Sequence, residues 1–262
     1  MKLPIYQVDA FTGKLFGGNP AAVCVLKEWL DEELMQAIAA ENNLAETAFV
    51  VPNKDRFGIR WFTPAVEVDL CGHATLASAH VIFAYHRYGR DEIVFSSARS
   101  GILKVKKNRD LLTLDFPADV ITPADVPQGL IEGIGTVPIE TYKGKTDYLA
   151  VLASQSDLER LAPNYDRIAK LDARGLIVTA KGNEADFVSR FFAPQSGINE
   201  DPVTGSAHTT LTPYWAARLG KSELTAIQLS PRRGHLQCKH LGERVHISGQ
   251  ACTYLIGEIA VR

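Results

Sequence analysis

The stretch "RWFTPAVEVDLCGHATLASAH", residues 60–80, recurs in altered form as "RFFAPQSGINEDPVTGSAHTT", residues 190–210. At a fixed offset of 130 residues the two segments align without a gap, so that Arg60 falls on Arg190 and Pro64 on Pro194. Self-similarity at a long, fixed spacing indicates a duplicated structural unit. The sequence therefore predicts two lobes of the same design.

Each half of the chain carries the same coarse order of a short strand, a surface helix, two strands, a long helix and a hairpin. The surface helix of the first half is expected to begin at Asp31, a favourable N-cap residue followed by two glutamates. Alternating apolar positions and β-rich composition predict strands in this half over residues 5–11, 46–51, 58–62, 92–97, 101–106 and 111–116.

The long helix of the first half, "ATLASAHVIFAYHRYG" at residues 74–89, is apolar or small on nearly every face. A helix that is apolar all round is buried. We therefore predict an α+β fold in which each lobe is a bent, mostly antiparallel sheet around a central helix. The proline-rich segment 115–127 suggests a boundary, which gives lobes at 1–117 and 118–252. The last strand, about 253–262, is expected to return to the first lobe.

The overall composition argues against several classes of protein. Hydrophobic residues make up 46% of the chain, charged residues 22%, and the net charge is -2. This balance provides neither a basic surface for nucleic acid nor a polybasic membrane patch. No apolar run approaches the ~20 residues of a membrane span. We expect a cytoplasmic protein with reduced thiols. Because the histidines and cysteines lack zinc-site spacing, no metal site is expected.

Positions that differ between the two copies are the best candidates for chemistry, because positions that are alike in both copies serve the fold. Glu46, in "LAETAF", has Gly175 as its loose counterpart. At the same offset of 130, the other unmatched polar pairs are His73 with Val203, Cys71 with Asp201, and Leu76 with Ser206.

Two glycines, Gly72 and Gly205, are expected to begin the two central helices. The first backbone N–H groups of a helix lack intrahelical partners and lie at the positive end of its dipole, so they bind anions. Neither segment is a phosphate-binding loop of the G-x-x-x-x-G-K type, which favours a carboxylate. Two similar lobes packed side by side would leave a cleft, a common place for a ligand.

Each candidate also has a purely structural interpretation. Glu46 is equally compatible with a surface strand position, His73 with a helix cap, and Cys71 with a small buried apolar residue. Asp201 before Pro202 is compatible with a turn. Other polar residues are assigned to structure: Asn19 to a turn, and His80 and His208 to the core. The functional interpretation is favoured because these unmatched polar residues fall at equivalent places in the two lobes.

Five segments together resemble a known family: "QVDAFT", "GNPAAV", "NLAETAF", "GHATLASAH" and "EDPVTGSA". They occur in the order found in the PhzF-like proteins, the phenazine-biosynthesis isomerase family, over almost the whole chain. These proteins share the two-lobed diaminopimelate-epimerase fold. The resemblance implies that Glu46 is the catalytic acid/base and that His73 and Asp201 bind and polarise the substrate. It also implies that Ser206, with backbone groups of Gly72 and Gly205, completes the pocket.

The family member in phenazine synthesis moves a proton within a dihydro-hydroxyanthranilate ring without metal or organic cofactor, and relatives are commonly homodimers. The resemblance thus implies a cofactor-independent isomerase acting on a small cyclic or amino carboxylate. The epimerases of this fold use two thiols. Cys71 occupies the first thiol position here and the second falls at Pro202, so a two-cysteine racemisation is not expected.

Two other functions stay open. One is a racemase or epimerase that pairs Glu46 with Cys71 or Asp201 on opposite faces of the substrate. The other is a non-catalytic ligand-binding protein on the same scaffold. Arg232 and Arg233, in "SPRRGH", either contact a substrate carboxylate or belong to a turn.

Overall fold

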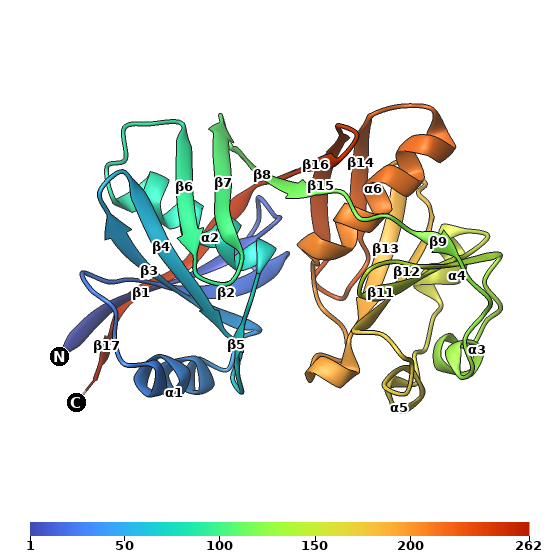
Figure 1. Cartoon of the computed structure of the whole chain (residues 1–262), viewed down its shortest axis with the longest axis horizontal. Helices are drawn as coiled ribbons and strands as arrows, with labels where there is room; N and C mark the ends of the chain where they lie inside the picture. The colour runs from blue at the N-terminus through green and yellow to red at the C-terminus, as the bar shows by residue number, and fades with distance from the viewer. Residues whose placement is uncertain (262) are drawn as a thin grey trace. The chain divides into compact units, whose positions relative to one another are not determined.

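The computed structural model describes residues 1–261, and the chain divides into two compact units (Figure 1). The first unit comprises Met1–Asp115 together with Ser248–Arg262, and the second comprises Phe116–Ile247. Within the described residues, no helix has the length and apolar character needed to cross a membrane.

The sheet of the first unit contains two parallel pairs of strands among otherwise antiparallel neighbours. The parallel pairs are β2 with β3, joined by helix α1 (Glu32–Asn42), and β4 with β6, joined by helix α2 (Gly72–Tyr85). In order of pairing, the strands are β17 (Ala251–Ala260), β1 (Lys2–Ala10), β2 (Asn19–Val25), β3 (Glu46–Asn53), β4 (Arg56–Phe62), β6 (Glu92–Ser97), β7 (Gly101–Asn108) and β8 (Leu111–Pro117), with β5 (Glu67–Val68) also on β4.

The second unit repeats this pattern of pairings. Its parallel pairs are β11 with β12, joined through α4 (Gln155–Glu159) and α5 (Tyr165–Ile168), and β13 with β14, joined through α6 (Gly205–Leu219). Helix α3 (Leu130–Ile134) precedes them. In order, the strands are β9 (Thr122–Pro123), β10 (Glu140–Lys143), β11 (Asp147–Val151), β12 (Gly175–Lys181), β13 (Phe187–Phe192), β14 (Glu223–Gln228) and β15 (Gly234–His240), followed along the chain by β16 (Arg244–Gly249).

A buried helix forms the centre of each unit, as predicted. In α2 the residues from His73 to Ala79 are all buried. In α6 the ring of Trp215 stacks on Phe187 with 5.9 Å between centroids, and Leu211 is fully buried. Burying one large apolar side chain contributes about 1.5–3 kcal/mol, so packing around these helices is the main source of stability in each unit.

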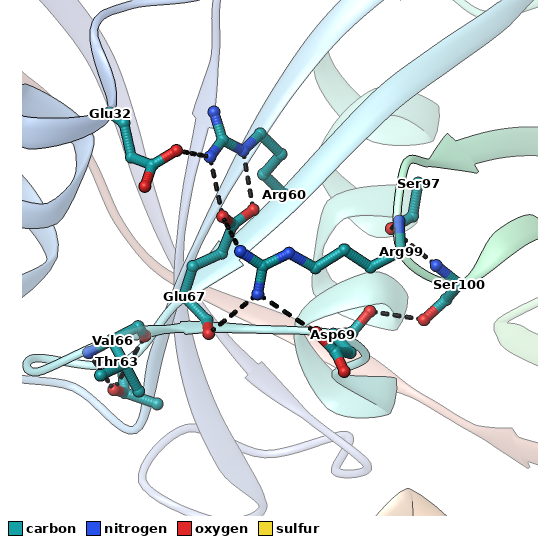
Figure 2. A network of polar contacts seen from close by, with 9 residues as sticks. All are labelled: Glu32, Arg60, Thr63, Val66, Glu67, Asp69, Ser97, Arg99 and Ser100. Atoms are coloured by element: carbon teal, nitrogen blue, oxygen red, sulfur yellow. Dashed lines mark hydrogen bonds and ion pairs between the residues drawn. The ribbon is translucent and has the colours of Figure 1, made fainter.

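The same arginine ion pair stabilises both units. In the first unit Arg60 binds Glu67 through two hydrogen bonds of 2.7 Å (Figure 2). Its guanidinium lies 5.1 Å from the ring centre of Phe62. In the second unit Arg190 binds Glu200 at 2.7 and 2.8 Å, and its guanidinium lies 5.1 Å from the ring of Phe192. The match of Arg60 with Arg190 in the sequence therefore reflects a shared structural contact.

The gapless offset of 130 holds to Phe62 and Phe192 and is wrong from Glu67 and Glu200 onward. Glu67 and Glu200 are 133 residues apart, because the second copy contains a short 3-10 helix, η1 (Pro194–Ser196), between its arginine and its glutamate. The two central helices keep this larger spacing, since α2 begins at Gly72 and α6 at Gly205. The structural equivalents past the insertion are thus Cys71 with Thr204, His73 with Ser206, and Val68 with Asp201.

Two local predictions need correction. Asp31 does precede α1 as its N-cap residue, but its side chain makes no capping hydrogen bond. Asn19 does not make a turn with Pro20; it is the first residue of β2 and is fully buried. The search for alternating apolar and polar residues missed β2. After Asn19, its sequence "NPAAVCV" is small or apolar at every position, as in a strand buried on both faces.

Candidate functional site

Glu46 is the first residue of β3 and its side chain is held inside the first unit. The residue is 9% exposed, although glutamate is rarely buried unless it has a partner. Its Oε2 atom lies 3.2 Å from Nε2 of His73. Apart from this contact with His73, Oε2 has no hydrogen-bond donor among the described residues, so it can accept a further hydrogen bond.

His73 and Cys71 are placed by the start of α2. Cys71 is the N-cap residue and His73 the second residue of the helix, so both side chains lie at the end where the first N–H groups have no helical partner. Their exposed fractions are 5% and 4%. The Cys71 sulfur lies 3.5 Å from Nδ1 and 4.0 Å from Nε2 of His73. The structure therefore brings these two side chains together with Glu46 within the first unit.

Asn19 is the member of this cluster that sequence reasoning missed. Its side-chain amide lies 3.1 Å from Nδ1 of His73, on the opposite side of the imidazole from Glu46. An amide offers both a donor and an acceptor, so Asn19 can bind either protonation state of the ring. The signal available in the sequence was a polar residue leading an otherwise apolar, buried strand.

The charges of this cluster set its protonation. Burial lowers the pKa of His73, but the neighbouring Cys71 sulfur and the Glu46 carboxylate raise it, and the net result is a pKa well above the ordinary value. Burial, together with the charge of Glu46, raises the pKa of the Cys71 thiol to about 11. The cluster therefore favours the protonated form of the His73 imidazole and the neutral form of the Cys71 thiol.

In the second unit, Asp201 lies in the loop before α6 and is 8% exposed. Its carboxylate accepts a hydrogen bond of 2.5 Å from the hydroxyl of Thr204, the N-cap residue of α6. Gln228 stabilises this loop, because its amide donates to the Asp201 carbonyl at 2.7 Å and accepts from the Thr204 N–H at 2.9 Å. The start of α6 is therefore rigidly positioned.

Gly205 and Ser206 form the first turn of α6. The Ser206 hydroxyl accepts a hydrogen bond of 3.0 Å from Arg174. Arg174 also binds the buried Asp147 through two contacts of 2.9 and 2.5 Å. This ion pair was not predicted, because Asp147 and Arg174 come from different segments and carry no recognisable motif.

The strand register explains how these groups correspond. Phe49 pairs with Arg60 and Val178 with Arg190, so Glu46 and Gly175 stand at the same position, as proposed from the sequence. A side chain at Gly175 would meet the ring of Phe191 at 2.5 Å, which excludes a glutamate there.

Other residues singled out in the sequence are structural or lie elsewhere. His208 is fully buried and bonded to the Thr204 carbonyl at 2.8 Å, and His80 contacts the hydroxyl of Thr253 at 2.8 Å. Arg233 lies in the turn between β14 and β15, where its N–H donates to the Ser230 carbonyl. A pocket of about 820 Å³ in the second unit contains none of the predicted site residues.

Comparison with known proteins gives consistent matches. The model of the family described as phenazine biosynthesis-like protein matches residues 8–257. An uncharacterised isomerase of Pseudomonas aeruginosa is 52% identical over 260 residues, which cover 99% of both chains. The crystal structure of a phenazine biosynthesis protein of the PhzF family from Enterococcus faecalis is 45% identical, covers 100% of both chains and has a TM-score of 0.97.

A more distant structure extends the likeness in fold alone. A hydroxyproline epimerase from Agrobacterium vitis is 10% identical, with a TM-score of 0.65, over 99% of this chain and 93% of the other. The predicted α+β fold of the diaminopimelate-epimerase type is thereby confirmed.

Proposed function

The chain belongs to the phenazine biosynthesis-like (PhzF) family and is an isomerase, and we propose that it moves a proton within a small cyclic or amino carboxylate, with Glu46 as acid and base. The observation that carries this proposal is the buried Glu46 carboxylate, whose Oε2 contacts the His73 imidazole and has no other hydrogen-bond donor among the described residues. A carboxylate held in this way is available to a proton on a substrate carbon.

The proposed reaction needs no external reactant. Glu46 takes a proton from an activated carbon of the substrate, which leaves an enolate-like anion, and returns the same proton to another carbon. The protonated imidazole of His73, 3.2 Å from Glu46, supplies positive charge next to both the carboxylate and the developing anion. General acid–base catalysis of this kind typically contributes roughly 10²–10⁴-fold to the rate.

Substrate binding is assigned to the starts of the two central helices. We propose that backbone N–H groups near Gly72 and Gly205 and the hydroxyl of Ser206 bind the carboxylate, since helix N-termini favour anions. Asp201, fixed by Thr204, is proposed to bind a polar group of the substrate. The homodimer, the cytoplasmic location and the cleft between the lobes stay predictions.

Solvent deuterium exchange tests the role of Glu46. The purified protein is incubated in D₂O with a panel of small cyclic and amino carboxylates, and incorporation is followed by mass spectrometry. We expect Glu46→Gln to lose roughly 10²-fold or more of the exchange rate. Glu41→Gln, a change of the exposed glutamate near the end of α1, serves as the matched control. Undiminished exchange in Glu46→Gln would exclude Glu46 as the base.

A racemase or epimerase is the second candidate, favoured by the Cys71 thiol that accompanies Glu46. A thiol with a pKa of about 11 is protonated at neutral pH and can deliver a proton to the face opposite a base. In the second unit Pro202 stands at the position of the second thiol and Thr204 is the structural equivalent of Cys71, so neither position supplies a second thiol. Inversion of a stereocentre, lost in Cys71→Ser, would support this function over proton migration.

A further inference from the structure

We propose that Glu46, Cys71 and His73 bind one zinc ion, which inhibits the enzyme by occupying the position of the reacting part of the substrate. Their donor atoms, a carboxylate oxygen, a sulfur and an imidazole nitrogen, all lie within 4.8 Å of one another. Zinc accepts this combination of ligands readily, whereas magnesium and calcium prefer oxygen. Zinc binding follows from this geometry alone, and the inhibition rests on the proposed function.

The distances are close to those of a tetrahedral zinc centre. With metal–ligand bonds of about 2.0–2.3 Å, tetrahedral geometry separates nitrogen from oxygen by about 3.3 Å and nitrogen from sulfur by about 3.5 Å. His73 Nε2 lies 3.2 Å from Glu46 Oε2 and 4.0 Å from Cys71 Sγ. The Cys71 sulfur would therefore have to approach Nε2 by about 0.5 Å for ideal tetrahedral geometry.

Asn19 can support a metal on Nε2 once its amide is reversed. A zinc-bound histidine usually donates its other ring N–H to a nearby oxygen, which fixes the orientation of the ring. The fully buried Asn19 side chain has its amide nitrogen 3.1 Å from Nδ1, and a half-turn about its terminal C–C bond would place the amide oxygen there to accept that N–H. Three protein ligands also leave a fourth position for water or a carboxylate.

The second unit offers a matched comparison within the same chain. At the positions of Glu46, Cys71 and His73 it has Gly175, Thr204 and Ser206, which include no thiol, imidazole or carboxylate. Zinc is therefore expected to bind once per chain.

Cobalt(II) serves as a spectroscopic probe of zinc binding to the full-length protein. We expect one equivalent of Co²⁺ to give visible bands of tetrahedral cobalt and an ultraviolet thiolate charge-transfer band, both displaced by Zn²⁺ but not by Mg²⁺. Cys71→Ser should lose the charge-transfer band. Cys252→Ser, a change of a free cysteine on β17, should retain it. A band that survives in Cys71→Ser, or no band in the parent, overturns the inference.

Two further measurements separate zinc binding from folding and from catalysis. Asn19→Ala should weaken Zn²⁺ binding about 10–100-fold, and its thermal unfolding checks that the unit remains folded. Zinc should inhibit deuterium exchange in the parent and in Cys252→Ser. The inhibiting concentration should equal the Zn²⁺ concentration that displaces all of the bound Co²⁺. Cobalt binding in a protein without exchange activity would refute the isomerase proposal alone, whereas full exchange at saturating zinc would refute inhibition.

Discussion

The two units place different chemistry at equivalent positions of one topology. In the first, Glu46 on β3 faces a histidine at the start of α2. In the second, the carboxylate belongs to Asp147, which pairs with Gly175, and it is neutralised by Arg174. Arg174 then reaches Ser206, the counterpart of His73.

This difference teaches that duplication preserved the pairing of strands and left the side chains at the helix starts free to diverge. The glutamate of the first unit, Glu46, is buried beside His73, whose imidazole can gain or lose a proton. The aspartate of the second is held by a guanidinium that stays charged at any physiological pH. One site is suited to proton transfer, and the other to binding an anion or a hydroxyl group.

The shared arginine ion pairs can be broken to compare the two units. Glu200→Gln should destabilise the protein by about 3–5 kcal/mol, because it leaves the largely buried Arg190 without a counterion. Glu67→Gln should cost about 1–3 kcal/mol, because Arg60 keeps its contact with Glu32 (Figure 2). Urea denaturation measures both, and a larger loss for Glu67→Gln would contradict the comparison.

Converting His73 to its counterpart removes the proposed cation. His73→Ser should lower the deuterium-exchange rate by roughly 10²-fold, since the developing negative charge loses its protonated neighbour. His80→Gln, in the same helix but bonded to Thr253, should stay within about two-fold of the parent under the same principle. Equal rates for both variants would remove His73 from the mechanism.

The two buried helix histidines should respond to acid in opposite ways. Burial lowers the pKa of His208 from 6.5 to about 4, so the unfolded chain takes up the proton first as the pH falls. The contribution of His208 is complete above pH 6.5 and is lost toward pH 4, whereas the raised pKa of His73 favours the folded state in acid. Between pH 7.5 and 5 the parent should lose about 2 kcal/mol more stability than His208→Gln. Parallel stability curves from denaturation at each pH would show that His208 does not titrate on unfolding.

Removing the guanidinium from the second unit should have the smallest effect on turnover, while it should also lower stability because the buried Asp147 loses its ion pair. Arg174→Met leaves Ser206 without its donor and should raise KM about 3–10-fold, with kcat nearly unchanged, if this unit only binds substrate. Steady-state kinetics on a substrate found by the exchange screen would measure it. A fall in kcat with unchanged KM would assign Arg174 to the chemical step.

Much of the fold was predictable because its signals are local. Alternating strands such as 92–97 and the uniformly apolar α2 carry their burial in their own composition. The equivalence of the two helix starts was not predictable, because the three residues of η1 are inserted where chance identities hide the gap. Asn19 and Arg174 were missed for another reason: each acts through a residue far away in the chain, which only the pairing of strands reveals.

The return of β17 to β1 has a consequence for how the chain acquires its structure during synthesis. All residues of the second unit leave the ribosome before β17, which pairs with β1 from Lys2↔Ala260 to Ala10↔Ala251. The first unit is synthesised earlier, but this edge of its strand β1 stays unpaired until β17 has been made. The second unit can fold before that point. A released chain that ends at residue 250 should protect the second unit from proteolysis and leave the first one open to cleavage.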